Sequence, residues 1–225
     1  MGQIAENLEI IHAQIAKAAH DAGRDPYDVQ LVAVSKVQPE ARIEEALAAG
    51  QRCYGENRVQ EAQGRWAERR AGCPELKLHL IGPLQTNKVK DAVALFDVIE
   101  TVDREKLASA LAKEMAKQGR VLPCFIQVNT GEEDQKAGIA PADLEDFYRF
   151  CVEACGLNVV GLMCIPPVDE PAALHFALLK KHADALGLSQ LSMGMSADFE
   201  TAIALGATLV RVGTGVFGAR VAAPH

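Results

Sequence analysis

Lys36 is the first residue of this sequence whose type and position suggest chemistry. It follows the apolar run "LVAVS" (31–35), which is typical of a buried strand. An amine that is desolvated and lies near other cations has a lowered pKa, and it then attacks aldehydes to form a Schiff base. Lys36 alone is equally consistent with a lysine that extends from a strand end into water. Its interpretation therefore depends on the residues around it.

Two glycine-containing segments near the C-terminus have the composition of phosphate-binding turns. "RVGTG" (211–215) supplies flexible backbone N–H groups and the Thr214 hydroxyl. "SMGMSADFE" (192–200) leads from a predicted strand into a helix predicted to begin at Ser196, and helix N-termini favour anions. Each segment alone is also consistent with an ordinary tight turn. Together with Lys36 they predict a site for pyridoxal 5′-phosphate (PLP), which carries both an aldehyde and a phosphate.

The elements that must position these residues alternate along the chain. An amphipathic helix comes first, with Ile4, Leu8, Ile11 and Ile15 at helical spacing. Further helices are predicted at 39–50, 103–120, 140–156, 170–187 and 196–206, with Asp103 expected to cap the second of these. Apolar, β-rich runs predict eight strands, at 29–36, 52–57, 76–82, 95–102, 123–129, 159–166, 190–195 and 208–213.

This order of elements predicts an α/β fold, a (β/α)8 TIM barrel with an extra N-terminal helix. No shift of composition and no long linker divides the sequence, so we expect a single domain over residues 1–225. A doubly wound open sheet is the alternative, but such sheets usually have fewer strands.

The chemistry of such barrels lies at the C-terminal ends of the strands. Polar residues gather there, including Glu56 and Asn57 after the second predicted strand. Because successive strand side chains point to opposite faces, four polar residues are predicted to converge inside the mouth of the barrel. These four are Lys36, His79, Asn129 and Arg211.

Composition excludes several other classes of function. The formal net charge of −7 and the absence of a basic cluster argue against nucleic-acid binding. No run approaches the ~20 apolar residues of a membrane span. The six cysteines show no CxxC spacing, which favours reduced thiols in a cytoplasmic protein. His175 and His182 lie seven residues apart without a matching carboxylate pattern, so we expect them to face solvent and predict no metal site.

Seven motifs, taken in order, resemble the PLP homeostasis proteins, the YggS-like family, which is related to the N-terminal domain of alanine racemase. The similarity extends from about residue 4 to residue 220. The motifs are "AVSK", "YGENRVQE", "HLIGPLQTNK", "KAGI", "GLMCIP", "LSMGMSADFETAI" and "RVGTGVFG".

The resemblance implies that PLP is bound as a Schiff base on Lys36. It implies that Arg211 faces the pyridine nitrogen and that Asn57 lies near the ring. The phosphate would be held by Met195, Ser196, Gly213 and Thr214.

Members of this family are thought to bind PLP and to pass it on within vitamin B6 homeostasis, without established enzymatic activity. The resemblance therefore implies a non-catalytic cofactor carrier, with apo PLP-dependent enzymes as recipients.

The sequence departs from the family pattern at two positions. Gln38 stands where members often carry a second lysine, and Leu78 stands where many have tryptophan. Lys136 matches a family lysine and is an alternative cofactor contact.

An arginine opposite the pyridine nitrogen would also weaken PLP as an electron sink, because it disfavours a second cation there. Racemases offset this with a tyrosine from a second domain, for which this chain has no room after its last strand. Its own tyrosines are Tyr27, Tyr54 and Tyr148, and Tyr54 is expected to lie nearest the rim. Because the second domain of the racemases is missing, we expect the protein to be a monomer.

Three other functions stay open on the sequence alone. The first is a PLP-dependent racemase or lyase that uses His79 or a cysteine as acid and base. The second is a Schiff-base aldolase without a cofactor, and the third is a scaffold with a vestigial site.

Overall fold

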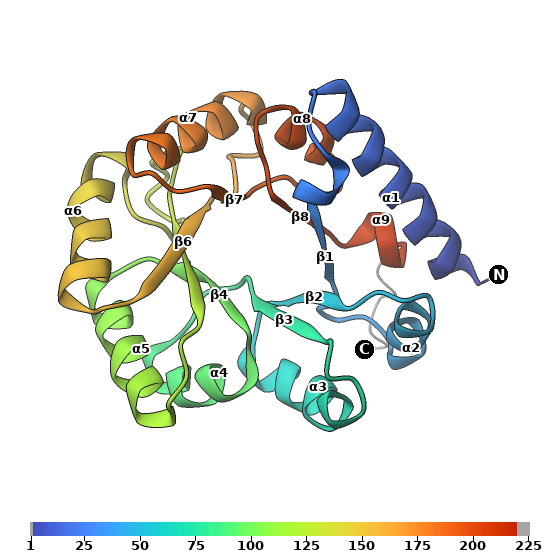
Figure 1. Ribbon diagram of the computed structural model, residues 1–225, viewed down its shortest axis with the longest axis horizontal. Coiled ribbons are helices and arrows are strands. Elements are labelled where there is room, and N and C mark those ends of the chain that lie inside the picture. The colour runs from blue at the N-terminus through green and yellow to red at the C-terminus, as the bar shows by residue number, and fades with distance from the viewer. Residues whose placement is uncertain (1, 220–225) are drawn as a thin grey trace.

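Eight parallel strands form a closed barrel in the computed structural model, which describes residues 2–219 (Figure 1). Each strand pairs with its neighbour in sequence, and β1 closes the ring against β8. The predicted barrel is thus confirmed. The strands are β1 (Gln30–Val34), β2 (Cys53–Glu56), β3 (Lys77–Leu80), β4 (Val98–Val102), β5 (Pro123–Gln127), β6 (Asn158–Met163), β7 (Gln190–Ser192) and β8 (Leu209–Val212).

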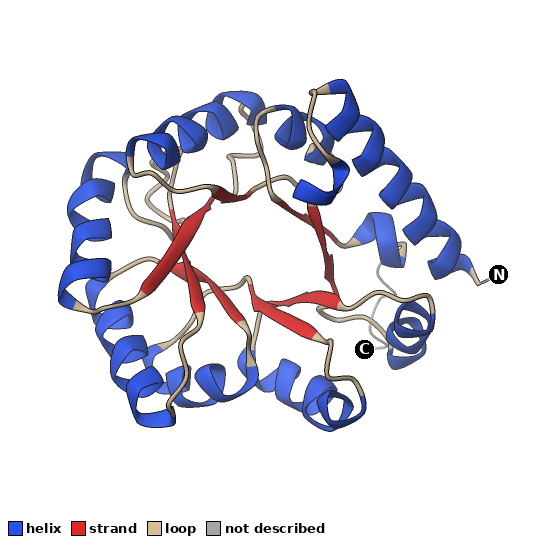
Figure 2. Cartoon of the chain, in the orientation of Figure 1, coloured by secondary structure: helices blue, strands red, loops and turns tan. Residues whose placement is uncertain are grey.

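Helices surround the barrel on its outer side (Figure 2). The expected N-terminal helix is α1, which packs against α2, α8 and α9. No helix among residues 2–219 is both long enough and apolar enough to cross a membrane. The helices are α1 (Gln3–Asp21), α2 (Glu40–Ala48), α3 (Val59–Gly72), α4 (Val89–Leu95), α5 (Glu105–Gln118), α6 (Leu144–Arg149), α7 (Ala172–Ala185), α8 (Phe199–Ala204) and α9 (Thr214–Phe217), with the short turns η1 (Pro26–Asp28), η2 (Thr86–Lys88), η3 (Pro141–Asp143) and η4 (Phe150–Ala154).

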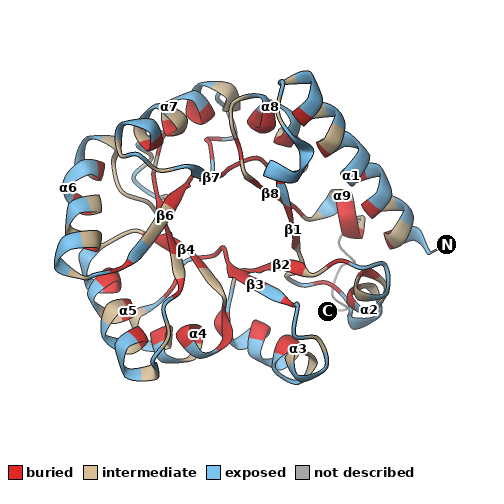
Figure 3. Ribbon diagram, in the orientation of Figure 1, coloured by how far each residue is buried: buried red, intermediate tan, exposed pale blue. Residues whose placement is uncertain are grey.

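Alternation along the strands divides the core into two layers, and the strands are the most buried part of the fold (Figure 3). On β1, Leu31 and Ala33 belong to the large apolar layer between strands and helices. Val32 belongs to a small cluster inside the barrel with Phe125 and Met163. Side chains on β1 thus alternate with a period of two between the interior of the barrel and the layer under the helices.

Two predicted helix starts are wrong, and one predicted helix is not continuous. Asp103 does not cap α5, because the N-cap residue is Arg104 and no side chain caps it. The predicted helix 140–156 is divided into η3, α6 and the π-helical turn η4. The last predicted helix does not begin at Ser196, because α8 starts three residues later, at Phe199.

Candidate cofactor site

Lys36 lies in a tight turn directly after β1, and its side chain is half-buried. The N–H of Gln38 donates to the carbonyl of Ser35 at 3.2 Å and closes this turn. Val37 has a φ of 54°, in the left-handed region that a β-branched residue rarely adopts. Such a conformation persists only where the surroundings hold it.

Arg65 on α3 supplies that support. Its Nη1 donates to the carbonyl of Ser35 at 2.7 Å, and its Nη2 donates to the carbonyl of Gln38 at 2.9 Å. Nη1 also contacts Oε1 of Glu56 at 2.8 Å. One guanidinium thus spans the segment that carries Lys36.

Glu56 was expected at the rim of the barrel, and this expectation is wrong. It is fully buried on the helix side of β2, where Oε1 accepts from the Ser35 hydroxyl at 2.6 Å and from Trp66 Nε1 at 3.0 Å. Its role in the fold is to join the ends of β1 and β2 to α3.

Arg211 lies inside the barrel on β8, and its side chain is 4% exposed. Its Nη1 donates to the Ser192 hydroxyl at 2.6 Å, and its Nη2 donates to the carbonyl of Cys164 at 2.8 Å. The Ser192 hydroxyl contacts Oε2 of Glu100 at 2.5 Å, and Oε1 of Glu100 contacts Nδ1 of His79 at 2.6 Å. A continuous polar chain therefore links β8, β7, β4 and β3.

Burial and neighbouring charges act in opposite directions on this chain. Burial by itself lowers the pKa of His79, but the adjacent Cys53 and Glu100 outweigh it and raise that pKa to about 10. Burial likewise opposes ionisation of Glu100, yet His79, Arg211 and Ser192 bring its pKa below the ordinary value. The favoured state is a protonated His79, an ionised Glu100 and a charged Arg211.

Alternation had predicted His79 in the mouth of the barrel, and this prediction is wrong. His79 points inward, but it lines a pocket at the N-terminal end of the strands together with Lys77 and Asp97. Alternation fixes the face of a strand residue but not its depth along the barrel axis.

The loops after β7 and β8 meet at the C-terminal end of the barrel. The N–H of Gly215 donates to the Ser196 hydroxyl at 3.4 Å, and the N–H of Arg211 donates to the carbonyl of Gly194 at 3.0 Å. Within residues 2–219, no acceptor is hydrogen-bonded to the backbone N–H of Ser196 or Gly213. Such N–H groups, close together and without an acceptor, are suited to an anion.

The segment between β7 and α8 is shaped by Gly194 and Asp198. Gly194 has a φ of 92°, and a Cβ there would lie 2.6 Å from the Cβ of Ala202. The carboxylate of Asp198 accepts from the N–H of Met195 at 2.6 Å. These contacts hold Met195 and Ser196 at the start of the turn that leads into α8.

Strand pairing brings the predicted residues onto one part of the barrel. A Cβ placed on Gly213 would lie 3.5 Å from the Cβ of Val34, so β8 ends beside the segment that carries Lys36. Asn57 follows β2, which pairs with β1 on the side away from β8. A Cβ placed on Gly82 would lie 2.4 Å from the carbonyl oxygen of Asn57, so the loops after β2 and β3 are in close contact. Asn57 also lines a pocket of about 670 Å³ with residues of the "PLQTNK" motif, including Gln85 and Lys88.

Three other residues from the sequence analysis have different surroundings. Asn129 exchanges hydrogen bonds with the backbone of Glu133 in the loop after β5. Lys136 contacts the Glu133 carboxylate at 2.6 Å and donates to the carbonyl of Pro166. Gln38 is buried, and its Oε1 accepts from Arg42 at 3.2 Å.

His175 was expected to face solvent, and this expectation is wrong. His175 is buried on α7, with Nδ1 at 3.1 Å from the Thr130 hydroxyl and Nε2 at 3.2 Å from Glu170. No group of three or more metal-ligating side chains occurs in the part of the chain that the structure describes.

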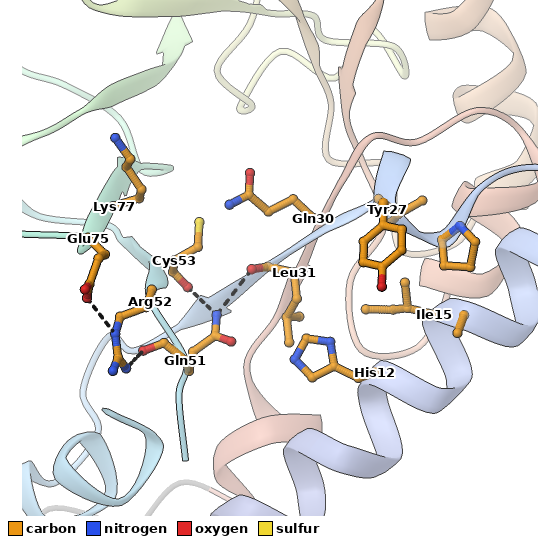
Figure 4. A pocket seen from close by; sticks show the side chains of 13 residues that line it. His12, Ile15, Tyr27, Gln30, Leu31, Gln51, Arg52, Cys53, Glu75 and Lys77 are labelled. Carbon is orange, nitrogen blue, oxygen red and sulfur yellow. Dashed lines mark hydrogen bonds and ion pairs between the residues drawn. The ribbon is translucent and has the colours of Figure 1, made fainter. Parts of the chain in front are cut away.

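A pocket of about 680 Å³ lies at the opposite end of the barrel (Figure 4). Residues at or just before the starts of β1, β2 and β3 line it, with His12 and Ile15 of α1 on one side. None of the predicted cofactor residues belongs to it. The chemical groups suited to PLP are instead gathered at the C-terminal end.

The residues at that end fit the chemistry of PLP. An amine lies after β1, a buried guanidinium lies on β8, and N–H groups without an acceptor follow β7 and β8. An aldehyde, a pyridine nitrogen and a phosphate each find a matching partner type in this set.

The fold and this site define a class of protein: a parallel α/β barrel whose C-terminal rim carries backbone N–H groups suited to an anion. The model of the alanine racemase N-terminal domain matches residues 5–221. A pyridoxal phosphate homeostasis protein of Pseudomonas aeruginosa is 45% identical, over 98% of this chain and 97% of the relative. The protein of the same name from Escherichia coli K12 is 38% identical, over 98% of each chain.

Solved structures agree. PipY of Synechococcus elongatus, described with PLP bound, is 40% identical with a TM-score of 0.84, over 96% of this chain and all of PipY. An alanine racemase of Clostridium difficile shares the fold with a TM-score of 0.72 at 14% identity, and 57% of its chain is covered. The present chain belongs to the family of pyridoxal phosphate homeostasis proteins.

Proposed function

We propose that this protein binds PLP at the C-terminal end of its barrel, as a Schiff base on Lys36, and serves PLP homeostasis as a carrier. In this proposal Arg211 faces the ring nitrogen and Asn57 lies beside the ring. Met195, Ser196, Gly213 and Thr214 hold the phosphate. The observation that carries the proposal is the buried Arg211 next to N–H groups without an acceptor. The PLP described in PipY and the names of the relatives support it.

The residues of this chain favour holding the cofactor over transforming an amino acid. PLP supplies an electron sink, which is strongest when its ring nitrogen is protonated. Arg211 keeps its own proton and disfavours a second positive charge opposite it. We therefore propose that the bound cofactor undergoes exchange without catalytic turnover.

The tyrosines support this part of the proposal. Tyr54, expected nearest the rim, is fully buried on the helix side, with its ring centroid 4.5 Å from that of Trp66. Burial raises the pKa of Tyr54, which makes it a poor acid–base group. Tyr27 follows α1 at the N-terminal end of the barrel and is 97% exposed there.

The proposal extends to the cellular setting. The whole chain, residues 1–225, acts as a single domain and as a monomer in the cytoplasm. Its recipients are apo PLP-dependent enzymes, and it binds neither nucleic acid nor membrane.

Cofactor transfer tests the proposal directly. The purified protein is loaded with PLP and mixed with an apo-enzyme whose activity reports the arrival of the cofactor. We expect faster activation than with an equal concentration of PLP that is bound to an unrelated carrier protein and is released from it spontaneously. Transfer no faster than spontaneous release would contradict the carrier role.

Amino-acid turnover is tested in parallel. The loaded protein is incubated in deuterated water with each common amino acid, and exchange at Cα is followed by NMR. We expect no exchange above that of free PLP. Rapid exchange would instead favour a racemase or lyase.

A further inference from the structure

Ser192 is an obligatory link between Arg211 and Glu100. A serine hydroxyl has one proton to donate. Nη1 of Arg211 can only donate, so the Ser192 oxygen accepts from it at 2.6 Å. The hydroxyl proton is then committed to Oε2 of Glu100 at 2.5 Å. Both Ser192 and Glu100 are fully buried, so water does not compete for these bonds.

His79 occupies the other oxygen of the same carboxylate. Its Nδ1 lies 2.6 Å from Oε1 of Glu100, and the raised pKa of His79 keeps this ring protonated at neutral pH. The negative charge of Glu100 is therefore paired directly with His79. The hydrogen-bond path from Glu100 to Arg211 runs through the neutral Ser192 hydroxyl, while the charge of Glu100 also acts on the guanidinium through space.

The guanidinium of Arg211 is consequently fixed at two nitrogens by neutral oxygens. Nη1 contacts the Ser192 hydroxyl, and Nη2 contacts the carbonyl of Cys164 at 2.8 Å. A cation held by neutral acceptors keeps its charge available for a further partner. The N–H group of Gly213, which has no acceptor among residues 2–219, follows it on the same chain segment.

We propose that Ser192, Glu100 and His79 are positioning residues that fix the guanidinium of Arg211 against the pyridine ring of PLP, and that they do so through the neutral hydroxyl of Ser192. This inference rests on the proposed function. Its consequence is that the buried chain, and not Arg211 alone, controls how long the cofactor is retained.

The test compares PLP-loaded wild type with Ser192→Ala and Ser192→Thr. Two quantities are measured: the rate of PLP release and the ratio of the visible to near-ultraviolet absorption bands of the bound cofactor. Ser192→Ala leaves Nη1 without its acceptor. We expect release to be about tenfold faster, the effect of losing one hydrogen bond to a charged group. We also expect a changed band ratio.

Two variants serve as controls. Ser192→Thr keeps the hydroxyl, so we expect it to restore both quantities to within about twofold of wild type. Ser189→Ala removes an exposed serine hydroxyl just before β7 and should change neither quantity. Thermal unfolding of each cofactor-free variant shows whether it is folded.

A Ser192→Ala protein that matches wild type in release rate and band ratio overturns the inference, even if it is less stable. If Ser192→Ala does not fold, Glu100→Gln takes its place. Glutamine keeps the volume and the acceptor for Ser192 but removes the carboxylate charge that, with Cys53, raises the pKa of His79. It is expected to change the band ratio, and an unchanged spectrum overturns the inference. Failure of wild type to bind PLP at all would instead contradict the proposed function.

Discussion

At the residue scale, the decisive groups are polar side chains inside an otherwise apolar barrel. Arg211 could be predicted, because alternation on a short apolar strand put its side chain on the inner face. Glu100 and Ser192 were missed, although an acidic residue within the apolar run "DVIETV" was a signal. A buried carboxylate requires partners, and its partners His79 and Ser192 come from other strands. Their identity depends on depth in the barrel, which strand periodicity does not encode.

His79 gives a prediction for the pH dependence of stability. Its pKa is raised from the ordinary value of 6.5 to about 10 in the folded protein. A raised pKa contributes stability that is fully present below the unfolded value and is lost as the pH rises through the folded value. We therefore expect the midpoint urea concentration for unfolding of wild type to decrease as the pH is raised from 7 to 10.

The matched variant is His79→Gln, which cannot titrate. Lysines, tyrosines and cysteines also titrate in this range, so the difference between the two proteins is the quantity to compare. We expect the midpoint of the variant to depend less steeply on pH. Parallel curves for the two proteins would show that His79 is not held protonated.

At the element scale, the strands were predicted well and the helix starts poorly. Asp103 has the residue type of an N-cap, yet its carboxylate contacts Arg104 and α5 begins one residue later. Ser196 also looks like a cap, but Asp198 takes that position. Local sequence offers several capping residues within one turn, and tertiary contacts such as that of Ser196 with Gly215 decide among them.

The turn that carries Lys36 provides a prediction at this scale. Arg65→Lys keeps the charge but loses the planar fork that reaches both the Ser35 and Gln38 carbonyls. We expect a loss of about 2–3 kcal/mol in unfolding free energy, because buried acceptors lose charged donors. We also expect slower formation of the covalent PLP adduct, since Lys36 is less well fixed.

Urea unfolding and stopped-flow absorbance measure the two effects. Arg69→Lys, on the same helix with carboxylate partners that are largely exposed, is the control. It should change stability by less than about 1 kcal/mol. An Arg65→Lys protein that forms the adduct at the wild-type rate would show that the turn does not need this support.

Gly194 provides a second prediction, about the turn between β7 and α8. Gly194→Ala would place a Cβ 2.6 Å from Ala202 at a φ of 92°. We expect a loss of about 3 kcal/mol, combining a positive φ with overpacking. Gly187→Ala has a similar backbone, with a φ of 68°, but its Cβ would meet nothing within 4 Å. It should cost only about 1 kcal/mol. Equal losses in the two variants would show that close packing at Gly194 is unimportant.

At the scale of the whole molecule, closure of the barrel creates the site. Lys36 and Gly213 lie far apart in the sequence, and pairing of β1 with β8 brings their segments together. Asn57 and Ser196 lie on the strand connections to either side. The succession of eight strands and most of their helices could be read from the sequence, because each unit repeats a similar local pattern. Helices α3 and α4 were not among the predicted ones. The pairing of β1 with β8 could be expected because eight β/α units are the number that closes a TIM barrel.

The central claim concerns the amine of Lys36 and is tested most directly by chemical trapping. The PLP-loaded protein is reduced with borohydride, digested and mapped by mass spectrometry, with Lys36→Ala as the matched variant. The account predicts a stable pyridoxyl group on Lys36, together with loss of the visible absorption band of the bound cofactor in the variant. A reduced wild-type protein that carries its label on another lysine, or none at all, would contradict the account.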